Sequence, residues 1–434
     1  MICSIVEQKK MLNLIKKLWP INRSLTGEGN RKTLKILKSI CNSLKIKEIK
    51  SGKKVFDWTI PLEWNVREAW IKDSNDKVII DFKKNNLHLV GYSIPVKKKI
   101  KLNILKKKIF TLKDQPKAIP YVTSYYKKNW GFCVSHEFKK NVLEKYEENS
   151  FFDMKIDTKL NHKGNLRYGE YFIKGKKDKE ILISTYLCHP SMANNELSGP
   201  IVTMSLIDYF KRKKINYGLR FVIIPETIGA ISYIHKNLKK LTKNVFCGFN
   251  ITCVGDSRNY TFIKSKYENS PSDYSIEDVL KNKKLKYTKL NFLKRGSDER
   301  QYNSVGVNLG ITTFSRSKFD EFPEYHTSLD NFDFVSIKSL TQSFNVIKDS
   351  IELIQSSIYP KTQIVCEPFL TKRNFYPEIN IKGRKFKDKT KLILDFLQYS
   401  DGNFDLKKIS KKIKCKYSET KDIYKYLLKI KLVS

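Results

Sequence analysis

Short apolar runs alternate with longer amphipathic stretches through the middle of the chain. The apolar, β-rich runs lie at residues 181–187, 219–224, 244–255 and 305–314, and a polar loop follows each of them. The stretch 200–210 instead repeats apolar side chains at the spacing of a helix. Parallel strands joined by helices have this order, so the pattern predicts a doubly wound α/β sheet.

A different pattern fills residues 54–112, where apolar and polar residues alternate between short turns. Alternation with a period of two predicts strands with one buried face. Helical patterns lie on both sides of this stretch, so we expect a small β-rich subdomain inserted into the α/β domain. Residues 151–160 and 166–175 also read as strands around a turn at 161–165, which predicts a hairpin-like pair.

The last part of the chain has a third pattern. Residues 360–385 contain prolines and a glycine, which predict a linker with one or two short strands. Three short amphipathic helices follow within 386–434, with a turn at Asp401–Asn403. This order suits a winged-helix or helix–turn–helix unit. Such a basic unit is typical of DNA binding, but a protein-interaction or dimerisation module has the same pattern, and the sequence leaves both open.

The chain is strongly basic, with 84 Lys and Arg against 44 Asp and Glu and a formal net charge of +40. An excess of this size can indicate a nucleic acid, an anionic membrane or an acidic polysaccharide as partner. The positive charges are spread along the whole chain and do not gather in one segment. That distribution favours compositional drift over a dedicated binding surface.

Cysteine usage and the N-terminus bear on the compartment. The eight cysteines form no CxxC pair, and several lie in apolar surroundings, where cysteine behaves as a small buried side chain. They indicate a reducing environment. Residues 4–18 have lysines within an apolar pattern and predict an amphipathic helix, not a signal peptide. No apolar run reaches the length of a membrane span, so we expect a soluble, cytoplasmic protein.

Polar residues that bind metals or transfer protons follow the predicted strands. Because parallel strands end at one edge of a sheet, we expect these side chains to lie near each other. Imidazole and carboxylate groups bind zinc, and a further carboxylate can take a proton from metal-bound water. A single histidine after a strand is more often a hydrogen-bonded loop residue, so the prediction depends on the whole set. That set is His189, Glu196, Glu226, Asp256, Asp298 and His326.

Four motifs in this order resemble those of the co-catalytic zinc aminopeptidases. More closely, they are similar to bacterial proteins with an aminopeptidase-like domain that are described with polysaccharide biosynthesis. The segment NRSLTGEGNRKTL near the N-terminus resembles the same subgroup, and its donor-rich start, Asn22–Ser24, is a further candidate to line a site. The four motifs are CHPSMANNELSG, FVIIPETIG, GSDERQY and EYHTSLDN.

The resemblance implies a fold and a division of the chain. We expect a zinc-aminopeptidase-like α/β domain with a doubly wound mixed sheet, a small inserted β subdomain and a C-terminal winged-helix-like domain. The expected ranges are 1–53 with 113–358 for the α/β domain, 54–112 for the insertion, 359–385 for the linker and 386–434 for the winged helix.

The resemblance also assigns roles to single residues. His189 matches the first metal-binding histidine, His326 matches the last, and Asp298 matches an acidic residue near the site. Glu226 stands in the segment of paired glutamates, where one acts as general base. We therefore expect one zinc ion, held by His189, Glu196 and His326, with Glu226 as the catalytic base.

Three positions depart from the pattern of that family. Asn195 stands where a carboxylate bridges two ions, Thr227 replaces the second of the paired glutamates, and Thr252 falls where a metal-binding aspartate is expected. Amide and hydroxyl groups are poor replacements for charged oxygen ligands. Two occupied zinc sites are left open on this account, with Asn195, Asp256 and Asp298 as additional candidates to line the site.

Two functions from different classes follow from these considerations. The first is a metal-dependent hydrolase of aminopeptidase type, acting on an amide in a small peptide-like or amino-sugar substrate linked to polysaccharide biosynthesis. The second is a catalytically degenerate protein of the same fold that binds or regulates, with nucleic acid or a protein held by the winged helix. The sequence also leaves a homo-oligomer open.

Overall fold

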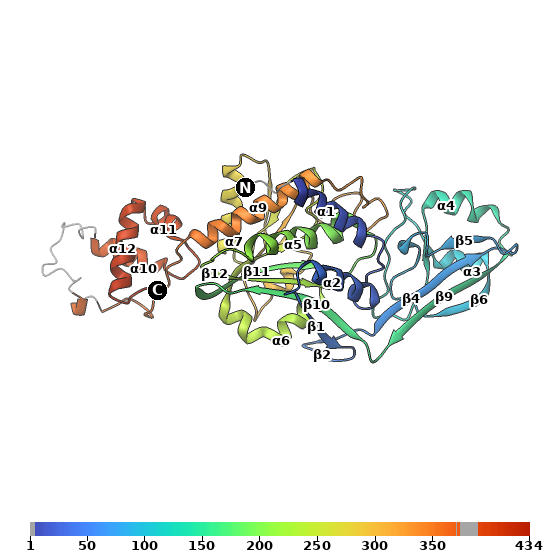
Figure 1. Cartoon of the computed structure of the whole chain (residues 1–434), viewed down its shortest axis with the longest axis horizontal. Coiled ribbons are helices and arrows are strands. Elements are labelled where there is room, and N and C mark those ends of the chain that lie inside the picture. Colours follow the sequence, from blue (N-terminus) through green and yellow to red (C-terminus); the bar gives the residue numbers. More distant parts are fainter. Residues whose placement is uncertain (1–4, 370, 374–388) are drawn as a thin grey trace.

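The computed structural model describes residues 5–369, 371–373 and 389–434 of the chain. Three parts follow one another along its long axis (Figure 1). A four-stranded sheet lies at one end, an α/β body forms the middle, and the C-terminal helices lie at the other end. No helix among the described residues is both long and apolar enough to cross a membrane.

An eight-stranded mixed sheet forms the centre of the α/β body. Its parallel part consists of four neighbouring strands, so their carboxyl ends meet at one edge, which faces the four-stranded sheet. The strand order is β1 (Lys45–Lys50), β10 (Asn165–Ile173), β12 (Tyr217–Ile224), β11 (Lys177–Tyr186), β13 (Val245–Ile251), β16 (Ile311–Ser315), β14 (Thr261–Ile263) and β15 (Thr288–Leu290). The predicted strand at 305–314 is therefore mostly a turn, and only its end forms β16.

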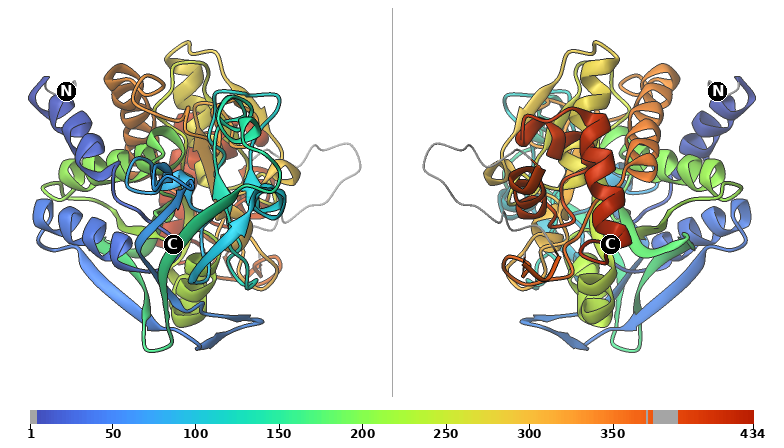
Figure 2. Two further views of the ribbon diagram at one scale, coloured as in Figure 1. Left: turned by 90° about the vertical axis from the view of Figure 1, so that its right-hand side faces the viewer. Right: turned by 90° about the vertical axis from the view of Figure 1, so that its left-hand side faces the viewer.

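Helices cover both faces of this sheet, as the doubly wound prediction requires. On one face lie α1 (Ile5–Leu18), α2 (Glu28–Ile40), α5 (Ser198–Phe210), α7 (Pro271–Asn282) and α9 (Ile337–Ser356). On the other face lies α6 (Ile228–Asn244), together with the short α8 (Glu299–Tyr302) (Figures 1 and 2).

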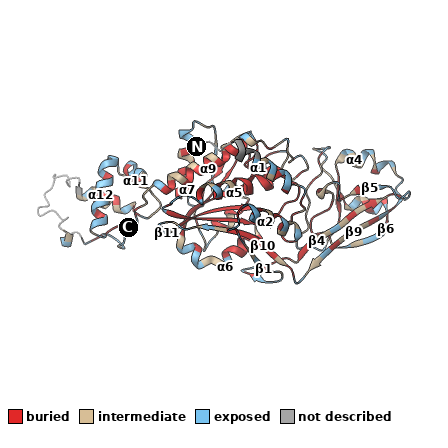
Figure 3. Cartoon of the chain, viewed as in Figure 1, coloured by how far each residue is buried: buried red, intermediate tan, exposed pale blue. Residues whose placement is uncertain are grey.

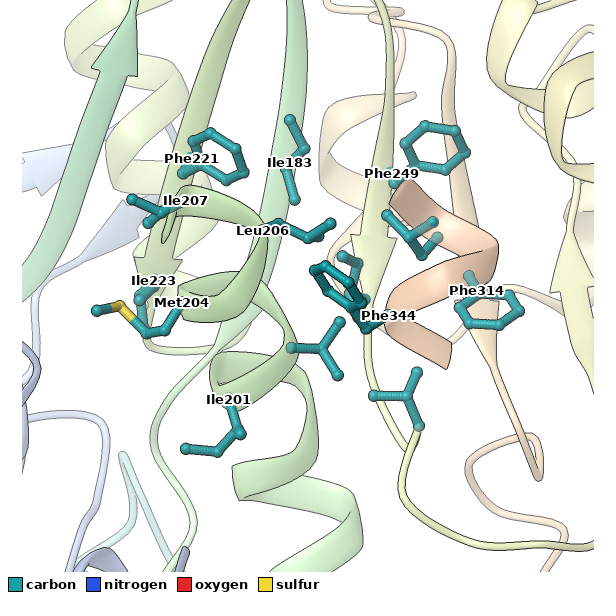
Figure 4. Close-up of a cluster of buried hydrophobic side chains, with 14 of the residues drawn as sticks. Ile183, Ile201, Met204, Leu206, Ile207, Phe221, Ile223, Phe249, Phe314 and Phe344 are labelled. Atoms are coloured by element: carbon teal, nitrogen blue, oxygen red, sulfur yellow. The ribbon is translucent and has the colours of Figure 1, made fainter. Parts of the chain in front are cut away.

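The two cores follow from the alternation of side chains along the strands. Ile181 and Ile183 of β11 face the core under α5 and α9, whereas Leu182 between them faces the core under α6. The central strands are buried over most of their length (Figure 3). Figure 4 shows side chains of this core, among them Phe249 from β13, Leu206 from α5 and Phe344 from α9. Burial on both faces explains why these strands are continuous apolar runs in the sequence.

The four-stranded sheet is antiparallel, with the order β5 (Val78–Asp81), β4 (Glu63–Lys72), β9 (Phe151–Asn161) and β6 (Val96–Lys101). Two small pairs also form, β7 (Ile109–Phe110) with β8 (Phe132–Cys133), and β2 (Lys54–Val55) with β3 (Trp58–Thr59), which lies beside α6 of the α/β body (Figure 1). Short helices, α3 (Leu102–Leu105) and α4 (His136–Asn141), lie in the same part of the chain. The sheet thus includes β9, which comes from beyond the range 54–112 expected for the insertion.

The predicted hairpin of residues 151–160 and 166–175 is wrong. β9 pairs with β4 and β6, whereas β10 pairs with β1 and β12, so the chain turns from one sheet into the other. The turn is held by backbone bonding from Gly164 to Asn161. A Cβ atom on Gly164 would lie only 2.0 Å from the Cβ of Glu63, so this turn needs glycine. Alternation identified both strands, but it carries no information on which partner each strand finds.

The C-terminal helices α10 (Lys389–Gln398), α11 (Leu406–Lys412) and α12 (Tyr417–Lys429) enclose a small core of their own. Residues 361–363, which the sequence placed in the linker, pair with the end of the chain. The N–H of Lys361 donates to the carbonyl of Ser434 at 3.1 Å, and the N–H of Gln363 donates to that of Leu432 at 2.9 Å. The C-terminal unit therefore begins before residue 386.

Glu63 joins the two large sheets at the corner between β9 and β10. It lies at the start of β4 and accepts hydrogen bonds from Arg167 of β10 at 3.0 Å and from Arg31 of α2 at 2.8 Å. Burial alone would raise the pKa of Glu63. The backbone N–H of Asn165 and the side chains of Asn65, Arg167 and Arg31 outweigh burial and lower this pKa to about 2.

We expect Glu63→Gln to lower the free energy of unfolding by about 1–2 kcal/mol at pH 7, after allowing for solvent screening. A lowered carboxyl pKa stabilises the fold above the unfolded value of 4.5, and this stabilisation is lost as the pH falls from 4.5 towards 2. Urea unfolding of both proteins at neutral and acidic pH measures this, and the difference should shrink in acid. Glu147→Gln, at an exposed position, serves as control; an equal loss there, or no pH dependence, would contradict the prediction.

Candidate active site

His189 and Glu226 lie together at the carboxyl edge of the parallel strands. His189 follows β11 and is buried, and Glu226 follows the neighbouring β12 with a side chain that is 20% exposed. The imidazole Nε2 of His189 lies 3.9 Å from a carboxylate oxygen of Glu226. The structure thus brings these two predicted residues into one site that solvent reaches on the side of Glu226.

Glu196 occupies the opposite side of the His189 ring. It lies in a π-helical turn, Ala193–Leu197, and its carboxylate is 2.9 Å from Nδ1 of His189. A carboxylate can only accept, so Nδ1 donates, and in the neutral ring Nε2 is left without a proton. The other oxygen of Glu196 lies 3.3 Å from Nε of Arg23, and both of these side chains are fully buried.

The charges around His189 act on its pKa in opposite directions. Burial would lower the pKa of His189, but the hydrogen bond and the charge of Glu196, with the charge of Glu226, outweigh burial and raise it. Burial also raises the pKa of Glu226, and the charge of His189 opposes part of that rise. Both pKa values are thus raised, that of the imidazole by its acidic neighbours and that of the carboxyl by burial.

His326 reaches the same site from the loop between β16 and α9. Its ring centroid lies 5.0 Å from that of His189, and Tyr121 contacts both rings at 5.3 and 5.2 Å. Tyr121 also donates its backbone N–H to the carbonyl of His326 at 2.8 Å, which fixes the loop. Burial, and then the charge of His189, lower the pKa of His326 well below the usual range, so this ring is neutral.

The Nε2 atom of His326 is buried and has no hydrogen-bond partner among the described residues. Buried polar atoms in proteins are nearly always bonded, so an unpaired imidazole nitrogen indicates a place for a ligand. A neutral imidazole with a free lone pair is what a transition metal binds. Nε2 of His326 is therefore a candidate atom to bind a ligand in this site.

The candidate ligand atoms that lie close together within the described part of the chain belong to Cys188, His189 and Glu196, all within 4.8 Å of one another. His326 is not in this group, so the expected set of His189, Glu196 and His326 remains a prediction. Sequence reasoning missed Cys188, although it directly precedes His189. Its Sγ accepts the backbone N–H of Glu226 at 3.3 Å, and burial raises the pKa of its thiol well above the usual range.

Two of the three departing positions, Asn195 and Thr252, are joined through Tyr186. Thr252 donates to the hydroxyl of Tyr186 at 2.5 Å, and Tyr186 in turn donates to the side-chain oxygen of Asn195. All three are buried and uncharged. Sequence reasoning missed Tyr186, which is the last residue of β11 and occupies the space between the two substituted positions.

The two aspartates named as additional candidates differ in role. Asp256 accepts four hydrogen bonds, from Asn194, from the backbone of Arg258 and from the backbone and hydroxyl of Ser317, so its oxygens are used to fix loops. Asp298 lies beside Glu226 instead. Burial, and then the charge of Glu226, raise the pKa of Asp298 well above its usual range, which favours the protonated form of this carboxyl.

Thr227 connects Glu226 to α6 in a strained conformation, with φ 61° and ψ −81°. A positive φ is unfavourable for a β-branched residue. Asp298 accepts its backbone N–H at 2.7 Å, and Arg300 donates to its hydroxyl at 2.6 Å. The motif GSDERQY therefore contributes two side chains that hold the turn carrying Glu226.

Comparisons with known proteins identify the family of the chain and its fold. A family model described as a domain of unknown function, DUF4910, matches residues 12–357, and a winged helix–turn–helix model matches residues 357–434. The chain belongs to the DUF4910 family. A relative from Clostridium acetobutylicum, described as a candidate polysaccharide biosynthesis protein with an aminopeptidase-like domain, is 40% identical over 369 residues, which are 85% of this chain and 83% of the relative.

Solved structures place this DUF4910 chain among aminopeptidase folds. The crystal structure of a candidate peptidase from Clostridium acetobutylicum matches with a TM-score of 0.79 at 36% identity, covering 98% of this chain and 96% of that one. A zinc aminopeptidase from Bacillus subtilis matches with a TM-score of 0.58 at 14% identity, covering 80% and 94%. The expected resemblance, the mixed α/β fold and the C-terminal winged helix are thereby confirmed.

Asp330 of this DUF4910 chain holds the loop that carries Glu196. Its carboxylate accepts the backbone N–H groups of Ala193 at 3.1 Å, Asn194 at 2.6 Å and Asn195 at 2.8 Å, at the start of the π-helical turn. Burial raises the pKa of Asp330 to about 7, and these three donors oppose the rise. An asparagine at position 330 would place its NH₂ group, which donates, against backbone N–H groups that also donate.

We expect Asp330→Asn to lower the free energy of unfolding by about 1 kcal/mol at pH 5.5, because a neutral amide replaces the carboxyl whose oxygens accept the three backbone N–H groups. A raised carboxyl pKa means that the wild type loses stability as Asp330 ionises through pH 7, so the difference should shrink or reverse at pH 8. Urea unfolding of both proteins at pH 5.5 and pH 8 measures this. Asp333→Asn, three residues away and exposed, should change stability by less than about 0.5 kcal/mol. Equal effects of the two substitutions would contradict the role given to Asp330.

Proposed function

We propose that the chain is a metal-assisted hydrolase of an amide bond, of aminopeptidase type. The observation that carries the proposal is the pair of imidazoles, buried His189 and half-buried His326, beside the partly exposed carboxylate of Glu226. The similarity of the fold to zinc aminopeptidases supports a hydrolase family. Two nitrogens and a carboxylate at one edge of a sheet are the groups that such chemistry uses.

The donor set fits one zinc ion. Zinc takes neutral imidazole nitrogens and carboxylate oxygens, and the free Nε2 atoms of His189 and His326 would hold it. The positions of Asn195 and Thr252 do not fit a second ion, because their uncharged side chains already bond to Tyr186. We therefore propose a single ion, and we assign Glu196 to the support of His189.

A bound zinc ion would polarise the amide carbonyl and make water more acidic. Glu226 would take the proton from the attacking water and return it to the departing amine. Burial raises the pKa of Glu226, which suits a group that must both accept and release a proton near neutral pH. Asp298 and Arg300 would keep Glu226 in place through the turn at Thr227.

The substrate class follows from the site and from the relative. An amide next to an amine or a sugar would suit a partly exposed carboxylate flanked by the aromatic side chain of Tyr121. The description of the Clostridium acetobutylicum relative links it to polysaccharide biosynthesis, so we propose small peptide-like amides and N-acyl amino sugars as the compounds to screen.

We expect about one zinc ion per chain in the purified protein by elemental mass spectrometry, and its loss in His326→Ala. Glu226→Gln should keep the metal but lower kcat by roughly 10²- to 10⁴-fold, because it cannot accept the proton. Glu321→Gln, an exposed neighbour of the site loop, is the control and should keep both. A wild-type protein that binds no zinc when it is supplied and hydrolyses none of these amides would instead be a binding protein that kept the fold.

A separate observation, in the winged helix, favours a second function, the binding of nucleic acid. The α12 helix exposes Lys421, Lys425 and Lys429, which are four residues apart and so lie on one face. In units of this kind the third helix enters the major groove of DNA. We propose that this row contacts phosphates, which would give the chain a nucleic-acid partner.

Replacing these three lysines by glutamine should weaken DNA binding and flatten its salt dependence by roughly 2.7, at about 0.9 for each phosphate contact in a plot of log affinity against log salt. Fluorescence anisotropy with a duplex over a range of salt concentrations measures both. The control carries the same change at Lys32, Lys35 and Lys38, which α2 exposes on the α/β body. Equal losses in the two variants would assign the binding to net charge.

A further inference from the structure

We propose that Arg23 and Glu196 are a buried pair of positioning residues that hold the His189 ring with its proton on Nδ1 and with Nε2 presented to Glu226. The proposal rests on the proposed function for its consequence, since Nε2 is the atom that would bind the metal. It assigns Glu196 a role behind the histidine in place of metal coordination.

Arg23 is fixed from three sides. Its Nη1 donates to the carbonyl of Leu18 at 2.6 Å, where α1 ends, and its Nε donates to the carbonyl of His189 at 3.1 Å. The same Nε lies 3.3 Å from the carboxylate of Glu196. One guanidinium therefore contacts both the backbone of His189 and the acid that holds its ring.

Because Arg23 and Glu196 are buried, each needs the opposite charge of the other. Arg23 and Glu196 have no exposed side-chain surface, and a lone buried charge costs several kcal/mol. The opposite charges of Arg23 and Glu196 offset each other at 3.3 Å, and a carboxylate oxygen can only accept from Nδ1. Second-sphere carboxylates of this kind fix the tautomer of metal-binding histidines in other proteins.

The N-terminal segment is bound to the site loop at several more points. Asn30 donates its amide to the carbonyl of Leu187 at 2.9 Å, and Asn86 donates to the carbonyl of Pro20 at 3.0 Å and to the hydroxyl of Ser191 at 2.8 Å. These bonds keep the loop 187–191 against the segment that carries Arg23. The position of the imidazole therefore depends on residues that precede it by more than 150 positions.

Glu196→Gln separates this role from a role as metal ligand. Arg23 would attract the carbonyl oxygen of the new amide, because a guanidinium only donates. The amide nitrogen would then face Nδ1 of His189, which must accept, and the ring proton would move to Nε2. A double variant with Arg23→Met removes that attraction, so the amide oxygen can turn back and Nδ1 can donate again.

Long-range ¹H–¹⁵N correlation spectra of the metal-free protein, taken at alkaline pH where the ring is neutral, report the tautomer of each histidine. The chain has six histidines, and His189→Gln assigns the signal. His88 is an internal standard, because its Nδ1 lies 2.7 Å from the carbonyl of Cys133 and must donate. An unchanged His88 signal also shows that each variant is folded.

The expected result is an Nδ1-protonated His189 in the wild type, an Nε2-protonated ring in Glu196→Gln and recovery of the Nδ1 form in the double variant. Zinc affinity of Glu196→Gln should fall by roughly 10- to 100-fold, as for other second-sphere groups. Glu63→Gln removes the partner of a different buried arginine, Arg167, and should change neither reading.

Three results would overturn the proposal. The first is an Nε2-protonated His189 in the wild type. The second is an unchanged tautomer in Glu196→Gln, and the third is a loss of zinc binding in that variant as complete as in His326→Ala, which would make Glu196 a ligand. A wild type that binds no zinc and cleaves no amide, yet has the expected tautomers, would refute the proposed function and leave the positioning pair intact.

Discussion

Parallel pairing of β11, β12 and β13 is the constraint from which the site arises. Strands that run side by side in one direction deliver the residues after them to one edge, so His189 and Glu226 meet although 36 positions of sequence separate them. The neighbouring β10 runs in the opposite direction, so its carboxyl end lies at the other side of the sheet. The four-stranded sheet then lies against the same edge (Figure 1).

Several buried side chains near this edge of the sheet either form an ion pair or favour a neutral form. The charges of Arg23 and Glu196 offset each other, burial favours the protonated form of Asp298, and burial keeps His326 neutral. Asn195 and Thr252 are also uncharged, and each forms a hydrogen bond with the hydroxyl of Tyr186. The site therefore contains few charged groups. Among these, the carboxylate of Glu226 is partly exposed and accessible to a substrate.

Much of the fold could be predicted from the sequence, because burial on two faces leaves continuous apolar runs and burial on one face leaves alternation. The partners of β9 and β10 could not, since alternation is the same whichever strand lies alongside. The site was predicted as a set of strand-end residues, and His189 and Glu226 do meet. The contact of Arg23 with Glu196 was beyond reach, because it joins a turn before α2 to a loop after β11, and no local pattern links them.

The first and last residues of the C-terminal unit, Lys361 and Ser434, lie next to each other. Lys361 and Ser434 exchange backbone hydrogen bonds in both directions, so the first residues of the unit and its last residue lie side by side. Adjacent ends are what allow a domain to be inserted into a loop of another protein without disturbing either core. The winged helix is therefore a portable module, joined to the aminopeptidase fold by one connection at the boundary between the two family matches, residue 357.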